Sequence, residues 1–275
     1  MTFTRPIEFS EAVQLASVKS ALPTNLTSAQ LRALAGELKS RAVFSARTTQ
    51  AEYLDQIAGT VQDILTGNLT PAQGRLQLKA AQTALGMRQD IPTGGEGVGD
   101  LTSDKRLDLI LKTNVDSARG FAQFVKAQAT VETFPCMELV RFEDRQDPRD
   151  WAARWKQAAL AAGDGRAYKA LVDGGRMVAR KDSGIWDSLG NLWDDSLGNP
   201  YPPFAFNSGM DWLEVERDDA VALGVIDDDT AVAAQELPDL NAEWQSGYEF
   251  RDAKLRDALT ADGLLKFVEG VLVPA

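Results

Sequence analysis

The sequence contains no histidine and a single cysteine, Cys136, among its 275 residues. Without histidine, the chain cannot form the usual serine or cysteine triads, a histidine general base or the most common zinc ligand sets. One cysteine excludes a disulfide framework and argues against a cysteine-built metal site, which favours a reducing intracellular environment. Enzymatic chemistry would have to use carboxylates, lysine, tyrosine or a hard metal ion. We find no catalytic motif and predict no cofactor and no metal.

Long apolar runs are also missing. No stretch approaches the roughly 18 to 20 apolar residues of a membrane span, and the first thirty residues do not follow the pattern of a signal peptide. With 44% hydrophobic and 25% charged residues, the chain is able to bury one good core or two modest ones. We therefore expect a folded, soluble, unsecreted protein without a membrane partner.

The net charge of −11 is unevenly distributed along the chain. Residues 101–181 carry fifteen basic and eleven acidic side chains, whereas residues 182–275 carry five basic and twenty acidic ones. Phosphate attraction depends on clustered lysine and arginine, so DNA would favour the middle and be repelled by the tail. Direct DNA binding by the whole protein is therefore disfavoured.

The first hundred residues have the pattern of a helical region. Apolar residues recur at helical spacing over about 28–45, 51–65 and 71–85, and Thr70, Pro71 and Gly86 are typical of helix ends. We predict a helical docking region over 1–88, followed by a glycine-rich linker over 89–100. The linker's GGEGVG is not a phosphate loop, because no apolar strand precedes it and no lysine and hydroxyl pair follows.

For the remaining residues, 101–275, the sequence pattern predicts an α+β domain over 101–226 and an acidic helical tail over 227–275. A long helix begins near Ser103, and a second helix follows Asp147–Asp150 and carries Trp151 and Trp155. Strands are expected at 137–142, 176–179 and 212–215, with a short helix over 217–223 and one or two helices in the last thirty residues. The predicted fold class is α+β: an amino-terminal helical region, then a small α+β domain with a short antiparallel sheet.

The segment from Arg176 to Arg217 combines tryptophans with turn-forming glycines and prolines and has almost no helical periodicity. Two units in it, IWDSLGN and LWDDSLGN, nearly repeat each other. Rigid turns with large aromatics either contact a partner or close a small core. The candidate contact residues here are Trp186, Trp193, Tyr201, Phe204 and Phe206.

An ordered series of motifs runs through the middle of the chain: RLDLILKTNVDSARGFAQF, FEDRQDPRDWAARW, GRMVARKDSGIWDSLG and YPPFAFNSGMDWLEV. In order and spacing, the series resembles the domain of the Mu F-like minor head proteins, or head morphogenesis proteins, of tailed phages and prophages. The resemblance covers roughly residues 103–217. The matching positions are Arg106, Thr113, Asn114, Asp144, Arg145, Pro148, Gly175, Trp186, Pro202, Pro203, Phe206 and Asn207.

The resemblance implies a low-copy protein that acts near the portal in head assembly and in DNA packaging or ejection. It would reside in the host cytoplasm during assembly and then in the phage head, with the portal and other head proteins as partners. Helix docking through an apolar stripe of Leu31, Leu34 and Leu38 is the expected mechanism. Many relatives have a histidine near the position of Trp151 and two cysteines within 208–210. This chain lacks both features, so their metal or thiol roles do not transfer.

A histidine-independent hydrolase stays open at the level of sequence. Carboxylates such as Asp194 with Asp195, or Asp187 with Glu214, would suit one if folding placed them in a concave pocket. Lys181 has no apolar setting in the sequence that would lower its pKa, so a lysine nucleophile is not expected.

A carbohydrate- or peptide-binding module is the second open alternative. It would use the tryptophan-rich turns and would require Trp186 and Trp193 to lie flat and exposed. Burial of both rings would argue against it.

Overall fold

The computed structural model describes residues 10–21, 42–43, 48, 50–87, 101–236, 260, 265–268 and 271–274. The chain divides into two compact units, Met1–Arg119 with Leu240–Ala275 (unit 1) and Gly120–Asp239 (unit 2). The division falls inside the long helix α6 (Asp104–Ala129). The predicted linker over 89–100 lies outside the described residues. The α+β fold class, with its amino-terminal helices and small antiparallel sheet, is confirmed.

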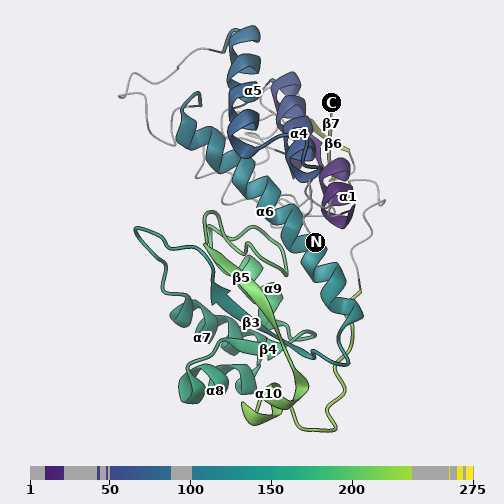
Figure 1. Cartoon of the computed structure of the whole chain (residues 1–275), viewed down its shortest axis with the longest axis vertical. Helices are drawn as coiled ribbons and strands as arrows, with labels where there is room; N and C mark the ends of the chain where they lie inside the picture. Colours follow the sequence, from purple (N-terminus) through teal and green to yellow (C-terminus); the bar gives the residue numbers. More distant parts are fainter. Residues whose placement is uncertain are drawn as a thin grey trace, which may run out of the picture. The chain divides into compact units, whose positions relative to one another are not determined.

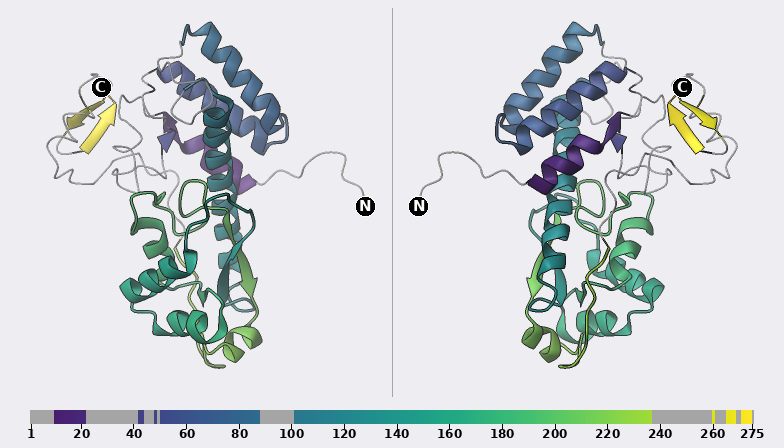
Figure 2. Two further views of the ribbon diagram at one scale, coloured as in Figure 1. Left: turned by 90° about the vertical axis from the view of Figure 1, so that its left-hand side faces the viewer. Right: turned by 90° about the vertical axis from the view of Figure 1, so that its right-hand side faces the viewer.

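Unit 1 is mainly helical. Its described elements are α1 (Ser10–Val18), β1 (Ser20–Ala21), β2 (Ala42–Val43), α4 (Ala51–Leu65), α5 (Pro71–Ala84), the first part of α6, and the strands β6 (Leu265–Val268) and β7 (Val271–Pro274). Helices α4 and α5 pack side by side (Figure 2). The prediction of two successive helices at 51–65 and 71–85 is confirmed.

The ends of these helices follow from their cap residues. Thr70 caps α5 by accepting a hydrogen bond from the Gln73 backbone amide, while the Gln73 side chain accepts one from the Thr70 amide. Gly67 and Gly86 follow the two helices with φ angles of 78° and 67°, a left-handed conformation that costs glycine little. The sequence signals at these positions therefore act locally, as expected.

The described core of unit 1 consists of apolar side chains from α4, α5 and α6, with one polar network inside it. Tyr53, Leu54, Ile57, Leu78 and Leu107 have exposed fractions of 1% or less. Gln82 donates to both the Tyr53 hydroxyl and the Leu101 carbonyl at 2.8 Å, so the buried amide and phenol satisfy each other. Burial raises the pKa of Tyr53 to about 12, although the Gln82 hydrogen bond and the charge of Arg106 oppose the rise.

Two sequence predictions for unit 1 are wrong in part. The helix expected over 28–45 lies mostly outside the described residues, and its end is instead the strand β2, which pairs in parallel with β1. The tail expected to be helical contains the antiparallel strands β6 and β7 (Figure 2, yellow). In LKFV and VLVP, β-branched and aromatic residues favour the extended backbone over a helix.

Unit 2 is an α+β domain with a three-stranded antiparallel sheet in the order β4-β3-β5 (Figure 1). Its described elements are the end of α6, β3 (Cys136–Arg141), α7 (Trp151–Ala162), α8 (Gly165–Gly174), β4 (Val178–Arg180), α9 (Ile185–Asn191), β5 (Met210–Val215) and α10 (Arg217–Ala222). The three strands and the helices at α6, α7 and α10 are where the sequence predicted them. Helices α8 and α9 were not predicted.

The two faces of this sheet pack against different cores. On one face, Trp212 of β5 contacts Trp186, Phe204 and Phe124, and Trp155 of α7 joins the group through Trp186. On the other face, a smaller cluster brings together Cys136, Ala170, Val178, Val215, Ala220, Val225 and Ile226. Alternation along the strands explains this separation, because successive side chains point to opposite faces. In the part of the chain that the structure describes, no helix has the length and apolar character needed to cross a bilayer.

Candidate functional site

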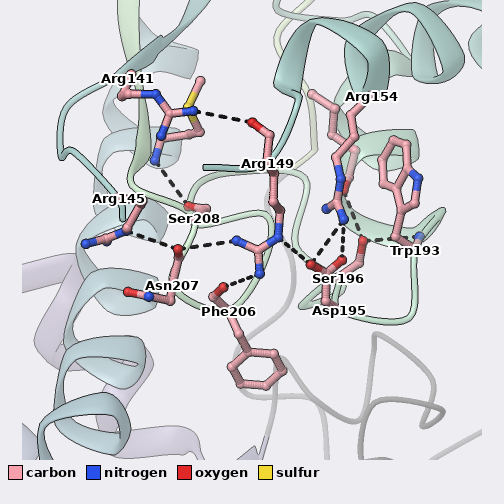
Figure 3. Close-up of polar contacts among 12 residues, drawn as sticks. Arg141, Arg145, Arg149, Arg154, Trp193, Asp195, Ser196, Phe206, Asn207 and Ser208 are labelled. Carbon is pink, nitrogen blue, oxygen red and sulfur yellow. Dashed lines mark hydrogen bonds and ion pairs between the residues drawn. The ribbon is translucent and has the colours of Figure 1, made fainter. Parts of the chain in front are cut away.

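Three arginines of unit 2 fasten the loop before α7 to the loop before β5 (Figure 3). Arg149 donates to the carbonyl oxygens of Phe206 at 2.7 Å and Asn207 at 3.3 Å, and it pairs with Asp195 at 2.6 Å. Arg154 pairs with the same carboxylate at 2.9 Å, and Arg145 donates to the Asn207 carbonyl at 3.2 Å. We call this group the arginine clasp: Arg145, Arg149, Arg154, Asp195 and the carbonyls of Phe206 and Asn207.

Local structure places the arginines of the clasp. Asp150 caps α7 by accepting from the Ala153 amide at 2.9 Å, which fixes Arg149 just before the helix and Arg154 in its first turn. On the opposing loop, Asn207 has a φ angle of 53°, and Gly209 has one of 68°. A Cβ at Gly209 would lie 2.6 Å from the Glu143 carbonyl oxygen, so only glycine lets the two loops approach this closely.

Two carboxylates, Asp195 and Glu143, compensate part of the positive charge of the clasp. Burial disfavours the charged form of Asp195, but hydrogen bonds and ion pairs with Arg154 and Arg149 outweigh burial and hold the pKa of this carboxyl below its usual value. The Arg154 guanidinium also lies over the rings of Trp151 and Trp193, at 5.3 and 4.8 Å from their centroids. Arg145 pairs in addition with Glu143 at 2.5 Å. These interactions fix the two loops to each other.

The structure brings together only part of the family motif. Arg145 and Asn207 meet in the clasp, and Asp144 and Pro148 lie in the same loop as Arg145. Gly175 follows α8 with a φ angle of 70° and ends that helix. The helix positions Arg106, Thr113 and Asn114 belong to unit 1. Arg106 is buried near Tyr53, and Asn114 donates to the Ile110 carbonyl in its own helix.

The proline-rich motif has a structural role that rests on two glycines. The peptide bond between Pro202 and Pro203 is cis. A Cβ at Gly120 of α6 would overlap the Pro202 carbonyl, and one at Gly190 of α9 would overlap the Asn199 carbonyl. The turn therefore fits against both helices only because these positions have no side chain.

Three of the predicted aromatic contact residues are core residues instead. Trp186, Tyr201 and Phe204 are at most 5% exposed, because their rings complete the aromatic core with Phe121, Phe124, Trp155 and Trp212. Their assignment as partner contacts is wrong. Trp193 and Phe206 are half-buried and keep part of their surface exposed. Leu31, Leu34 and Leu38 lie outside the described residues.

Sequence reasoning did not connect the two central residues of the clasp: Arg149 was not singled out, and Asp195 was considered only as a hydrolase carboxylate beside Asp194. The signals for them were weak. Three arginines, Arg141, Arg145 and Arg149, follow one another at intervals of four residues. LWDDSLGN has two aspartates, Asp194 and Asp195, where IWDSLGN has one. Neither pattern identifies a partner across the 46 residues that separate Arg149 from Asp195.

Each carboxylate pair offered for a hydrolase has one member bound to a cation, because Asp195 pairs with the arginines of the clasp and Glu214 with Lys181. Glu214 binds the Lys181 ammonium at 2.7 Å, and the same ammonium donates to the Ala127 carbonyl at 2.7 Å and the Thr130 hydroxyl at 3.0 Å. Burial lowers the pKa of Lys181, against the pull of Glu214, so the expectation that this lysine lacks a desolvating environment is wrong. Because its three N–H groups have three acceptors, Lys181 serves as a buried structural cross-link.

A shallow polar cavity of about 520 Å³ lies at the start of α8. Its charged lining is already paired: Arg166 with Asp227 at 2.6 Å and Arg180 with Asp182 at 2.9 Å. Ser183 also donates to Asp164 at 2.5 Å, and Asp164 accepts from the Ala167 amide. Within the described ranges, no three histidine, cysteine, aspartate or glutamate side chains are placed to share a metal ion.

Comparisons with known proteins found no matching family model, no matching curated protein and no matching solved structure.

Proposed function

We propose that this chain is a Mu F-like minor head protein of a tailed phage or prophage, acting in head morphogenesis near the portal. The observation that supports the proposal best is the hydrogen bond from Arg145 to the Asn207 carbonyl. These two motif positions are 62 residues apart, yet they meet in one clasp. This contact between two distant positions of the pattern is what supports the proposal.

The clasp suits an assembly role because it makes a rigid surface out of loops. Its backbone carbonyls are held by guanidinium groups, which form strong, directional hydrogen bonds. Around them, Asp144 and Asn207 are exposed, while Trp193 and Phe206 are half-exposed. Aromatic and arginine side chains on a preorganised surface are the composition typical of protein contacts.

Head proteins rather than DNA are the proposed partners of this surface. The arginines of the clasp are paired with Asp195 and Glu143, so their charge is largely used within the protein. Binding to DNA phosphates would require clustered, unpaired cations. The apolar stripe at Leu31, Leu34 and Leu38 remains the proposed second contact, for docking on the portal. The proposed location is the host cytoplasm during assembly and the phage head afterwards.

The test is co-purification of the tagged full-length chain with the portal and major capsid proteins encoded beside it. Point variants are preferable to truncation at Asp100, because Leu107 and Leu111 of α6 pack in the core of unit 1. We expect Leu34→Glu and Trp193→Ala each to reduce retention of head proteins at least five-fold. The matched control is Leu76→Glu, an exposed apolar position in α5 at 64% exposure, which should retain them. If the unaltered chain retains no head protein, the proposal is wrong.

A further inference from the structure

The last described segment of unit 2, residues 231–236, has neither helix nor strand and is attached to the domain mainly through side chains. The Ala233 amide donates to the Asp182 carboxylate at 3.2 Å. Gln235 donates from its backbone to the Gln128 side chain at 2.8 Å and from its side chain to the Lys181 carbonyl at 2.6 Å. Val232 packs, partly buried, against the cluster that contains Cys136.

These contacts tie the exit of unit 2 to its entry. The chain enters the unit along α6 at Gly120 and leaves it at Asp239. Gln128 lies in the last turn of α6, and Gln235 lies close to the exit. Their hydrogen bond spans 107 residues of sequence and joins the two ends of the unit.

The end of α6, where the chain enters unit 2, is held by several hydrogen bonds to Lys181. Lys181 uses all three ammonium protons on Ala127, Thr130 and Glu214, so the end of α6 is fixed to β5 and to the chain after β4. Lys181 is only 3% exposed, and its backbone amide donates to the Pro135 carbonyl at 2.9 Å. The acceptor that Lys181 offers to Gln235 therefore belongs to a rigid part of the domain.

Residues 231–236, where the chain leaves unit 2, make fewer stabilising contacts. Among the described residues, the segment has no ladder of backbone hydrogen bonds, and Ala231, Ala233, Ala234 and Glu236 are exposed. Segments with few buried apolar contacts and exposed backbone open at lower free energy than the core does. Residues 231–236 are thus weakly held against a rigid part of the domain around Lys181, and this contrast indicates that the segment is able to open by itself.

We propose that residues 231–236 form a latch that opens as a local unit, independently of the unfolding of unit 2. In the closed state, Gln235 ties the exit chain to the end of α6. In the open state, the chain after residue 236 is free of that tie, while the Lys181 cross-link and the sheet stay intact.

Native-state hydrogen exchange of the full chain tests the latch, with the amides of Ala233 and Gln235 compared with those of β3 at increasing urea. We expect the latch amides to exchange with little dependence on urea, and the β3 amides to exchange with the steep dependence of global unfolding. Loss of the side-chain bond in Gln235→Ala should speed exchange at Ala233 about five-fold, because a hydrogen bond of ordinary strength is removed. Exchange at Leu139 in β3 should not change.

The control is Glu236→Ala, an exposed neighbour whose substitution should leave exchange at Ala233 unchanged. If the amides of Ala233 and Gln235 show the same urea dependence as β3, the segment opens only when unit 2 unfolds, and no latch exists. Equal rates at Ala233 in Gln235→Ala and in the unaltered chain would likewise overturn the proposed tie. The protection of β3 in each variant shows independently that the domain is folded.

Discussion

Two consecutive segments of nearly identical sequence adopt different structures in unit 2. IWDSLGN, residues 185–191, is the helix α9, and its Trp186 is only 1% exposed. LWDDSLGN, residues 192–199, forms turns, and its Trp193 is half-buried against Arg154. Residue pattern alone therefore does not decide between a core helix and a surface turn.

The residues that come after each segment explain much of the difference. The second segment, LWDDSLGN, is followed directly by Pro200 and is called the second copy; IWDSLGN is the first copy. The Pro200 ring disfavours a helical conformation at Asn199, and Pro200 has no backbone N–H to donate. The first copy has no proline after it. It can complete its turns, and the Trp186 indole donates to the Arg180 carbonyl at 2.8 Å from within the core.

The equivalent glycines have different tasks as well. Gly198 has a φ angle of 82°, so it provides a left-handed turn. Gly190 sits in α9, where the Asn199 carbonyl would overlap any Cβ. The last residue of the second copy thus packs on the glycine of the first, and the two copies form one structural unit despite their different conformations.

The largest expected difference between the two copies concerns their tryptophans. Trp186→Ala should lower the free energy of unfolding by about 3 to 5 kcal/mol, because it removes a fully buried indole and leaves a cavity beside Trp155, Phe204 and Trp212. Urea unfolding followed by tryptophan fluorescence measures this, since five of the six tryptophans belong to unit 2.

The conservative variant Trp186→Phe separates volume from hydrogen bonding. It keeps an aromatic ring in the core but loses the bond to Arg180, so its loss of stability should be smaller than that of the alanine variant. A loss below about 1 kcal/mol for Trp186→Ala would contradict the core assignment, because a buried indole cannot be removed so easily.

The second difference concerns the aspartates and is seen in the pH dependence of stability. Asp195→Asn should cost about 2 kcal/mol at neutral pH, because it removes the partner of Arg149 and Arg154. The folded pKa of Asp195 lies below its unfolded value. Its stabilising contribution is therefore complete above an unfolded pKa of about 4 and is lost as the pH falls through the folded pKa.

Unfolding curves measured from neutral to acidic pH should thus converge for the Asp195→Asn variant and the unaltered chain. The first copy provides the control, because burial raises the pKa of Asp187, which is the opposite direction. Asp187→Asn should therefore not destabilise the protein at neutral pH, and any stability that it gains there should be lost as the pH falls through the raised pKa. A constant gap between the Asp195→Asn variant and the unaltered chain at all pH values would show that the ion pairs do not carry the effect.

Local signals predicted the parts of the fold that depend on local interactions. Thr70 and Pro71 at the start of α5 and Gly86 after its end were recognisable in the sequence, because each acts on the backbone of its own helix end. Helix α9 was missed because its glycine and its seven-residue length obscure helical periodicity. The clasp was missed because the pairing of Arg149 with Asp195 depends on the tertiary arrangement of two loops.

The smallest expected effect is that of the second tryptophan. Trp193→Ala removes one of two rings that flank the Arg154 guanidinium, and it leaves Trp151 and the ion pair with Asp195 in place. Cation–π contacts at partly exposed sites contribute about 0.5 to 1 kcal/mol, so the loss in urea unfolding should be about 1 kcal/mol or less. If Trp193→Ala proved as destabilising as Trp186→Ala, the second copy would be part of the core. A small loss of stability together with a large loss of head-protein binding would instead identify Trp193 as a contact residue. If Trp193 had only a structural role, binding would fall only as far as the loss of stability explains.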